Sequence, residues 1–516
     1  MVLTFKRITS LAILMLLGVV FALSSTNIMA QTRSDDSPKK SKGGQGKNGG
    51  NSSNKEKGKG SDKGNQKGGP QHVFAGPAPI HPFDVILGRP TDQSVTLSIL
   101  FYQDNVGYLT YGIDAGNLGE KTEITNFRAN SPEEIILKGL KTDTKYYYSI
   151  HYRKGNAGDF EKSREYSFHT QRKPGSEFRF TIQADSHLDQ GTRTAVYEKT
   201  LANVLGDKPD FHVDLGDTFM TDKYPDFKDS LPQYIAQRYY FGLVGHSVPL
   251  FLVLGNHDGE RLDRFDGTPN CMPVWSSITR KKYYPNPYPD KFYSGNNQEI
   301  KHVGKVGNYY SWEWGDALFI SLDPFWYTPR TSRNRPDGNW TRTLGETQYR
   351  WLEKTLSNSK AKFKFVFIHH LVGGLDFSAR GGIEAAALYE WGGKNNEGKD
   401  EFPNRRPGWT APIHQLLVKH KVSAVFHGHD HFFAKQELDS IQYIMVPQPG
   451  QAGFDRLRNV EEYGYIRGTF LPPSGHIRVT VSSDKSRVEY VRSYLPQVET
   501  GSRKNGDIGN SFLIRP

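Results

Sequence analysis

The chain has 516 residues, of which 13% are aromatic, so it has room for two or three domains and is not disordered throughout. Of its net charge of +11, residues 1–70 supply an excess of eight (twelve Lys and Arg against four Asp and Glu), and the near-neutral remainder gives no indication of a nucleic-acid enzyme. The single cysteine, Cys271, excludes an intrachain disulfide; we interpret it as a free buried thiol, with an intermolecular link as the alternative.

Residues 1–30 have the layout of a secretory signal peptide. Lys6 and Arg7 precede a charge-free run from Leu11 to Leu23, and small and polar residues follow up to Ala30, where we expect cleavage. An uncleaved anchor is the alternative, because the charge-free stretch approaches the roughly 20 residues that a bilayer requires. In both cases we expect an exported protein that is periplasmic, secreted or tethered to the surface.

Residues 31–75 form a linker rich in Lys and Gly. It contains nine lysines between Lys39 and Lys67, against Glu56 and Asp62. Such a segment buries too little apolar surface to offset the entropy of ordering it, so we expect it to be disordered. A solvated spacer is the simpler interpretation, and weak electrostatic contact with anionic surfaces is the other.

Residues 76–173 are predicted to form a small all-β domain. Several short runs rich in β-branched and aromatic residues lie close together, which is typical of a β-sandwich. These runs are 83–88, 94–100, 107–112, 134–137, 145–153 and 165–170. Residues 137–148 resemble the tyrosine-bearing corner of fibronectin type III-like domains.

From residue 174 onward, strands alternate with helices, and the strands end in polar residues. The first three predicted strands are residues 178–184, 211–215 and 248–254, separated by helical stretches at 192–205 and 230–244. Polar side chains follow each strand directly: Asp185-Ser186-His187, then Gly216-Asp217, then Gly255-Asn256-His257-Asp258. The carboxyl ends of buried parallel strands are where α/β sheets place their chemistry, so we expect these side chains to meet.

The second half of the domain repeats this pattern with histidine. A predicted strand at 363–368 ends in His369-His370, and another at 423–426 ends in His427-Gly428-His429-Asp430-His431. We also expect an antiparallel pair at 308–314 and 317–323, helices at 346–356 and 412–420, and closing strands at 440–447, 477–481 and 487–494. The combined nitrogen and oxygen ligands, without thiolate, suit Zn, Fe or Mn better than Ca or a cysteine-based zinc site.

Together these residues resemble the calcineurin-like metallophosphoesterase superfamily. The blocks that carry the resemblance are Asp185-x-His187, Gly216-Asp217, Gly255-Asn256-His257-Asp258, His369 and Gly428-His429-x-His431. With the preceding β-domain, residues 80–450 are most similar to the purple acid phosphatase group. The resemblance implies an α/β fold: an αββα metallophosphoesterase sandwich over residues 174–516, preceded by the small all-β fibronectin type III-like sandwich.

The resemblance also implies two metal ions and a role for each residue. Asp185, His187 and His431 would hold the first metal, Asn256, His369 and His429 the second, and Asp217 would bridge them. His257 would be the proton donor or transition-state stabiliser, and Asp258 would hold its imidazole in orientation. The implied function is an exported phosphomonoesterase in which a metal-bridging hydroxide attacks phosphorus. A phosphodiesterase or nucleotide hydrolase is the alternative, and a surface-binding protein with an inert site is a further one.

The sequence departs from purple acid phosphatases at two positions. Met220 stands three residues after the bridging aspartate, where those enzymes carry the tyrosine whose bond to ferric iron gives the colour. His187 is present where they usually lack a histidine. We therefore expect a histidine in place of the tyrosine, a colourless enzyme, and no obligatory ferric iron.

Substrate contacts are harder to predict. His370, Tyr309 and Arg380 are candidates. His427 and Asp430 adjoin ligands; they orient those ligands, contact the substrate or are plain turn residues. The stretches 261–305 and 373–409 are expected to be long loops over the site that select the substrate. The expected partner is a small phosphorylated substrate, with no specific nucleic acid; the sequence does not indicate the oligomeric state.

Overall fold

The computed structural model describes residues 78–155, 158–189, 191–224, 226–329, 338–451, 457 and 459–516. The expected signal peptide at 1–30 and the Lys- and Gly-rich linker at 31–75 both precede these residues, so both predictions lie outside the described structure. Among the residues described, no helix combines the length and apolar character that crossing a bilayer requires.

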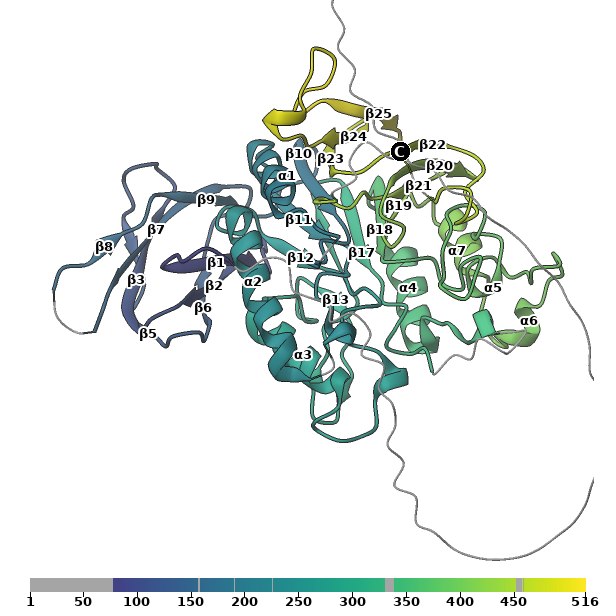
Figure 1. The fold of residues 1–516 in the computed structure, drawn as a ribbon, viewed down its shortest axis with the longest axis horizontal. Coiled ribbons are helices and arrows are strands. Elements are labelled where there is room, and N and C mark those ends of the chain that lie inside the picture. The colour runs from purple at the N-terminus through teal and green to yellow at the C-terminus, as the bar shows by residue number, and fades with distance from the viewer. Residues whose placement is uncertain are drawn as a thin grey trace, which may run out of the picture. The chain divides into compact units, whose positions relative to one another are not determined.

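The first described segment is all-β (Figure 1). One antiparallel sheet has the order β1-β2-β6, and a second has β3 and β7 at its centre, with β4 and β5 beside β3 and with β8 and β9 beside β7. The strands are β1 (Phe83–Gly88), β2 (Ser94–Phe101), β3 (Asn105–Gly112), β4 (Glu120–Lys121), β5 (Thr125–Phe127), β6 (Glu133–Lys138), β7 (Lys145–Arg153), β8 (Glu161–Lys162) and β9 (Tyr166–His169). Alternate residues of these strands, among them Leu97, Leu109 and Ile150, form one buried core.

The predicted tyrosine corner is visible in this segment. The hydroxyl of Tyr146 accepts a hydrogen bond of 2.9 Å from the backbone N–H of Lys141, five residues upstream. The expected all-β region is thus present, while its likeness to fibronectin type III domains stays a prediction.

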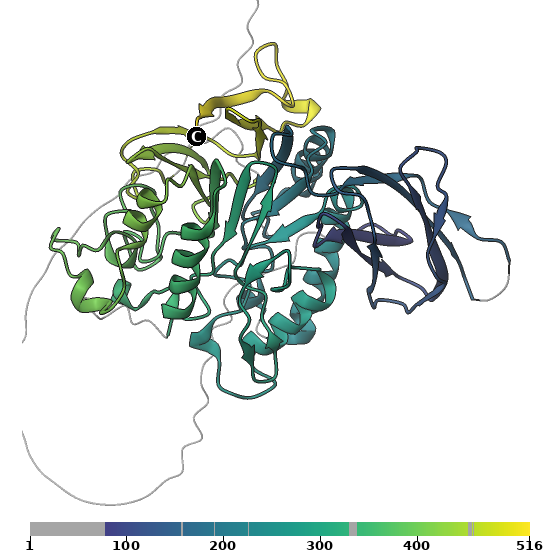
Figure 2. The same ribbon diagram turned by 180° about the vertical axis from the view of Figure 1, so that it is seen from behind.

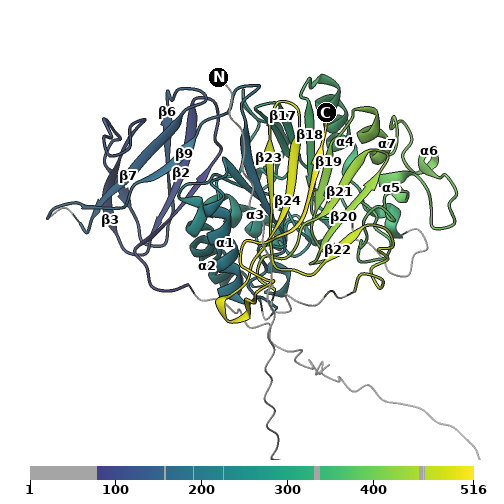
Figure 3. The ribbon, with the colours of Figure 1, turned by 90° about the horizontal axis from the view of Figure 1, so that it is seen from above.

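Two larger sheets follow. The six-stranded sheet has the order β12-β11-β10-β23-β24-β25, and the eight-stranded sheet has the order β13-β16-β17-β18-β19-β21-β20-β22. Figure 3 labels β23 and β24 of the first sheet and β17 to β22 of the second. The first contains β10 (Phe178–Gln183), β11 (Phe211–Asp214), β12 (Leu250–Leu252), β23 (Gly475–Val481), β24 (Ser486–Arg492) and β25 (Ile508–Ile514). The second contains β13 (Ser294–Gly295), β16 (Tyr310–Trp314), β17 (Ala317–Ser321), β18 (Phe363–Ile368), β19 (Ala424–His427), β20 (Phe433–Leu438), β21 (Ile441–Met445) and β22 (Thr469–Leu471). Strands β10, β11 and β12 are parallel, as are β17, β18, β19 and β21.

The two sheets pack face to face around an aromatic core. Phe180 and Phe211 of the first sheet meet Phe319 of the second in edge-to-face contacts, with ring centroids 5.1 Å apart in both pairs. Helices α1 (Thr194–Gly206) and α2 (Phe227–Gly245) lie on one side of the sandwich, and α4 (Gly345–Asn358) and α7 (Ile413–Lys419) lie on the other (Figures 1 and 2). The αββα arrangement predicted from the sequence is confirmed.

The two stretches expected to be loops contain regular structure. Residues 261–305 include α3 (Met272–Tyr283) and the short strands β14 (Glu299–Ile300) and β15 (Gly304–Lys305), and residues 373–409 include α5 (Tyr389–Gly392) and α6 (Phe402–Arg405). Short 3₁₀ turns lie at Thr221–Lys223, Leu262–Arg264, Gly338–Thr341 and Pro496–Val498. Helix α3 was not predicted, because its sequence lacks the apolar periodicity of an amphipathic helix. It buries polar side chains, including Ser276, Ser277 and Arg280, whereas Ile278 is exposed.

Candidate metal centre

The polar residues predicted to meet lie at the carboxyl ends of five strands. Asp185 and His187 follow β10, Asp217 follows β11, and Asn256 and His257 follow β12 in the first sheet. His369 follows β18, and His429 and His431 follow β19 in the second sheet. Because β10, β11 and β12 run parallel, as do β18 and β19, each sheet brings its own ligands to one edge, and packing of the two sheets joins them.

Two groups of candidate metal ligands result. One contains Asp185, His187 and His431, and the other contains Asp217, His369 and His429; in each group the ligand atoms lie within 4.8 Å of one another. The carboxylate of Asp217 connects the groups, since its Oδ2 lies 3.3 Å from Nε2 of His369 and 3.7 Å from Nε2 of His187. Asn256 joins the second group, with Oδ1 at 3.1 Å from Nε2 of His369.

The first group has the chemistry of a cation site. Oδ1 of Asp185 and Nε2 of His187 are buried and have no hydrogen-bond partner among the described residues. A buried polar atom without a partner is costly, and these two atoms, 3.8 Å apart, fit a cation held between them. Burial by itself raises the pKa of the Asp185 carboxyl, but His431, His187 and His369 hold that pKa below its usual range, so the carboxyl is ionised and able to bind metal.

The second group also combines carboxylate oxygen with imidazole nitrogen. Burial raises the pKa of the Asp217 carboxyl, yet His369 and His257 hold it well below its usual value. For His429, burial and then the nearby His369 lower the pKa to about 3, so its imidazole is neutral at physiological pH. A carboxylate and a neutral imidazole are the forms in which Asp and His bind Zn, Fe or Mn. Burial lowers the pKa of His369, but Asp217 and Asp185 outweigh this and raise it to about 9, so His369 would release a proton on binding metal. The residue types present fit two such ions.

The backbone that carries the ligands is held in an uncommon conformation. The φ angles of Asp185, His187, Asp217, His429 and His431 are 59°, 52°, 53°, 83° and 66°. Left-handed backbone at residues other than glycine costs about 1–3 kcal/mol each and persists only where surrounding contacts enforce it. Such a concentration is typical of a functional site.

Close approach of two strand ends explains the glycine of the third block. A Cβ added at Gly255 would lie 2.0 Å from the backbone N of Asp217. No side chain larger than hydrogen fits there, so Gly255 allows the loops after β11 and β12 to touch.

The structure corrects the role predicted for Asp258. Its carboxylate does not contact the imidazole of His257, and instead accepts hydrogen bonds from the backbone N–H groups of Gly255, Asp217 and Phe219 at 2.6, 3.1 and 2.7 Å. The imidazole Nδ1 of His257 bonds to Oδ1 of Asp222 at 2.8 Å. The reason is burial. Asp258 is buried, and the three buried N–H groups around it need an acceptor, whereas the side chain of His257 is partly exposed.

His257 lines a pocket of about 220 Å³ at the metal centre. His187, Asp217, His429 and His431 also line it. The ring of His257 is 21% exposed, and its Nε2 lies 3.9 Å from Oδ2 of Asp217. His257 is therefore beside both ligand groups and open to a bound substrate.

The three candidate substrate contacts have different positions. Arg380 lines the pocket, with its guanidinium 3.7 Å from the ring centroid of Tyr463 and Nη1 at 3.2 Å from Oδ1 of Asp430. Neither Tyr309 nor His370 is among the residues lining the pocket. Tyr309 is buried against Trp351, and His370 is buried behind His429, with ring centroids 5.3 Å apart.

Sequence reasoning missed two acidic residues that support the centre. Asp222 lies in the 3₁₀ turn Thr221–Lys223, and Asp189 has Oδ2 at 3.4 Å from Nδ1 of His187. Neither stands at a strand end, which was the signal that identified the ligands. Asp189 follows His187 by two residues, and this proximity in sequence is the one feature that could have indicated it.

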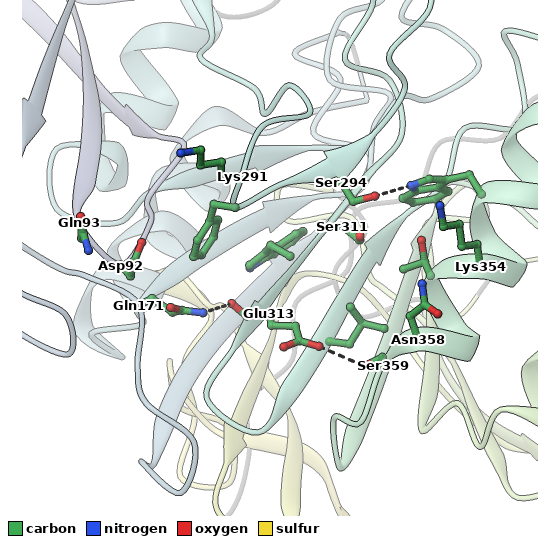
Figure 4. A pocket seen from close by; sticks show the side chains of 15 residues that line it. Asp92, Gln93, Gln171, Lys291, Ser294, Ser311, Glu313, Lys354, Asn358 and Ser359 are labelled. Carbon is green, nitrogen blue, oxygen red and sulfur yellow. Dashed lines mark hydrogen bonds between the residues drawn. The ribbon is translucent and has the colours of Figure 1, made fainter.

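A larger cavity, of about 730 Å³, lies elsewhere (Figure 4). Its lining includes Lys291 and Ser294 near β13, Glu313 of β16, and Lys354 and Asn358 of α4. It shares no lining residue with the pocket at the metal centre, and neither ligand group found among the described residues reaches it. Volume alone therefore does not identify the site of chemistry in this protein.

Residues 178–433 match the family model described as calcineurin-like phosphoesterase. This part of the chain is a calcineurin-like phosphoesterase domain. The matched residues contain all seven predicted metal ligands and His257, and they begin at β10 and end at the start of β20. The family implies a metal-dependent phosphoester hydrolase.

Solved structures show that the phosphoesterase domain and the preceding β-sandwich occur together elsewhere. The "Structure of PhoD" is 17% identical, covers 85% of this chain and 92% of that chain, and has a TM-score of 0.59. A purple acid phosphatase, PPD1, from yellow lupin (Lupinus luteus) seeds is 17% identical, covers 84% of this chain and 74% of that chain, and has a TM-score of 0.55. No curated protein sequence matches the chain. The architecture is thus similar to that of purple acid phosphatases, as predicted.

Proposed function

We propose that this protein is an exported hydrolase of small phosphate monoesters that works with two metal ions. The observation that carries the proposal is the position of Asp217, whose carboxylate lies between His187 of one ligand group and His369 of the other. A carboxylate shared by two such groups is the arrangement that lets two cations act on one substrate.

Seven residues would hold the ions. Asp185, His187 and His431 would bind one, Asn256, His369 and His429 the other, and Asp217 both. When bound, the ions supply a water that is ionised near neutral pH and positive charge for the phosphoryl oxygens. Zn, Fe and Mn all suit this ligand set.

His257 would supply the proton that the leaving alkoxide needs. Asp222 accepts a hydrogen bond from Nδ1–H of His257, which fixes the ring and leaves Nε2 facing the pocket. A protonated Nε2 beside the metal centre donates to the leaving oxygen as the ester bond breaks.

Arg380 would bind the phosphate group. Its guanidinium lines the pocket and is held from two sides, by the ring of Tyr463 and by the carboxylate of Asp430. Asp430 is itself fixed by the hydroxyl of Tyr465 at 2.8 Å and by the backbone N–H of Gly381 at 3.1 Å. A rigid guanidinium suits a planar pair of phosphate oxygens. The pocket volume of about 220 Å³ favours a small substrate.

The test compares p-nitrophenyl phosphate with bis-p-nitrophenyl phosphate, using purified protein loaded in turn with Zn²⁺, Mn²⁺ and Fe²⁺. A higher kcat/KM for the monoester supports the proposal. A higher value for the diester assigns the same residues to a phosphodiesterase or nucleotide hydrolase. If no metal supports hydrolysis of either ester, the chain is better described as a surface-binding protein with an inert site. The His257→Ala variant is the control for contaminating phosphatases.

Export is a separate part of the proposal and rests on residues 1–30. N-terminal sequencing of the protein recovered from outside the cytoplasm should begin at Gln31 if the segment is cleaved. A chain that retains Met1 in the membrane fraction would favour the uncleaved anchor, and retention in the cytoplasm would contradict export.

A further inference from the structure

Two loops of the metal centre need support from outside themselves. Loop 185–188 carries Asp185 and His187, and loop 217–220 carries Asp217. Asp185, His187, Leu188 and Asp217 all have positive φ, between 52° and 59°. Neither loop is part of a helix or strand. Two backbone bonds join the strand ends directly, from the N–H of Asp185 to the carbonyl of Gly216 at 2.9 Å and from the N–H of His187 to the carbonyl of Asp217 at 3.1 Å, and contacts with neighbouring elements add to them.

Helix α2 supplies these bonds to both loops through two glutamines. The amide Nε2 of Gln233 donates to the carbonyl of His187 at 2.6 Å, and its Oε1 accepts from the backbone N–H of Met220 at 2.8 Å. Gln237 donates from Nε2 to Oγ of Ser186 at 3.0 Å and to the carbonyl of Thr218 at 2.9 Å. Each glutamine therefore contacts both loops.

The spacing of the two glutamines makes this possible. Residues four apart lie one above the other on the same face of a helix, so Gln233 and Gln237 present a ladder of amides to the gap between the loops. Gln233 is 1% exposed and Gln237 is not exposed at all. Water cannot replace these bonds, and a buried carbonyl or N–H left without a partner costs about 1–3 kcal/mol.

The opposite part of α2 is fastened to the β-sandwich. Arg238, adjacent to Gln237, donates to the carbonyl and the hydroxyl of Ser98 in β2 at 2.9 and 3.1 Å, and also to the carbonyl of Tyr283. Near the end of the helix, a Cβ on Gly245 would lie 3.1 Å from the carbonyl oxygen of Val85 in β1. Helix α2 thus has contacts with β1, β2 and Tyr283 that do not involve the two metal-binding loops.

We propose that Gln233 and Gln237 are positioning residues of the metal centre. They hold loop 185–188 at a fixed separation from loop 217–220, so that one ion would be held by Asp185 and His187 from the first loop and by Asp217 from the second. The inference rests on the proposed two-metal site and deepens it, because it names side chains that bind no ion and yet determine how tightly an ion is bound.

The test measures metal affinity directly. Gln233→Met and Gln237→Met keep the length of the side chain and remove its hydrogen bonds, and Arg238→Met is the matched control on the same helix. Each metal-free variant is dialysed against a series of Mn²⁺ concentrations, and bound manganese is determined by elemental analysis. Circular dichroism and thermal unfolding without metal report whether each variant folds.

We expect each glutamine variant to bind Mn²⁺ about 10–100-fold more weakly than the wild type, the loss usual when residues that orient ligands are removed. Arg238→Met should unfold at a lower temperature and lose less affinity than either glutamine variant, because Arg238 bonds to neither loop. Glutamine variants that bind as the wild type does would overturn the inference, as would an equal loss in Arg238→Met. Should Gln237→Met not fold, Gln233→Met decides by the same criterion. A wild type that binds no Mn²⁺ contradicts the proposed metal centre itself, and the positioning role with it.

Discussion

The imidazole Nδ1 of His257 lies 2.8 Å from Oδ1 of Asp222, a residue 35 positions earlier in the chain. Asp258, the immediate neighbour of His257, forms no hydrogen bond with that ring and instead accepts hydrogen bonds from three backbone N–H groups. The two carboxylates therefore have separate tasks. Asp222 orients the proton-handling ring, and Asp258 shapes the turn on which that ring is mounted.

The first prediction concerns the pair His257 and Asp222. His257→Ala should lower kcat by about 10²–10⁴ and leave the metal content intact. Asp222→Asn should lower kcat less, because the ring remains but loses its fixed orientation. In the double variant the loss should be no greater than in His257→Ala alone, since Asp222 acts only through His257. Additive losses in steady-state kinetics would show that Asp222 has a role of its own.

Asp258 is expected to act on folding and metal content. In Asp258→Asn, one oxygen becomes an NH₂ group that faces backbone N–H donors, and each buried donor left unpaired costs about 1–3 kcal/mol. We expect a lower thermal midpoint and less bound metal per chain, measured by scanning calorimetry and elemental analysis. Asp222→Asn is the control, with wild-type metal content. If Asp258→Asn bound metal fully and lost only turnover, the role first predicted from the sequence would be right.

The ligands could be predicted because strand ends are visible in a sequence. Apolar runs such as Phe363–Ile368 identify a buried strand, and the polar residue that follows it must lie at the edge of the sheet. Asp185, Asp217 and His369 each follow one of the five strands that carry ligands. The repetition of a polar residue directly after a buried strand is the pattern that predicts these residues in one site.

The residues that support the site gave no such signal. Gln233 and Gln237 lie in a helix whose buried face carries polar side chains as well as apolar ones, so its periodicity does not mark them. Asp222 lies in a short 3₁₀ turn, and its contact with His257 depends on how two loops fold back on one another. Contacts between residues far apart in the chain depend on tertiary packing, so the local sequence pattern does not predict them.

A third prediction concerns the metals and the colour of the protein. Dialysis against a chelator should abolish hydrolysis, and adding Zn²⁺, Mn²⁺ or Fe²⁺ should restore it. No tyrosinate can bind iron three residues after Asp217, because Met220 stands there, is buried, and is held through its backbone by Gln233. The iron-loaded protein should therefore lack the visible charge-transfer band of purple acid phosphatases. A purple protein would contradict the ligand assignment.

A fourth prediction separates binding from turnover at Arg380. Removing a charge-assisted hydrogen bond to phosphate costs about 1.5–3 kcal/mol, so Arg380→Met should raise KM for p-nitrophenyl phosphate by roughly 10–100-fold. Arg380→Lys should recover only part of this, because lysine keeps the charge but loses the planar contact with Tyr463 and the fork that also reaches Asp430. An unchanged KM in Arg380→Met would show that Arg380 does not bind the phosphate.

The last prediction concerns stability away from the metal centre. At the end of α1, the carboxylate of Asp207 bonds to Nε2 of His476 at 2.7 Å and to Nη1 of Arg478 at 2.6 Å, both from β23, while Arg179 of β10 binds its backbone carbonyl. Burial raises the pKa of Asp207, but His476 and Arg478 outweigh this and lower it below its usual value. The charged carboxylate therefore ties helix α1 to the six-stranded sheet.

A carboxyl group with a lowered pKa in the folded state adds stability above its unfolded pKa and loses that contribution as the pH falls through its folded pKa. Asp207→Asn should thus reduce the free energy of unfolding by roughly 1–3 kcal/mol at neutral pH. The difference from wild type should shrink as the pH drops below about 4, the unfolded value for Asp. Urea unfolding across this range measures it, with Asp484→Asn as an exposed control. A difference that stayed constant with pH would mean that packing, and not charge, fastens the helix there.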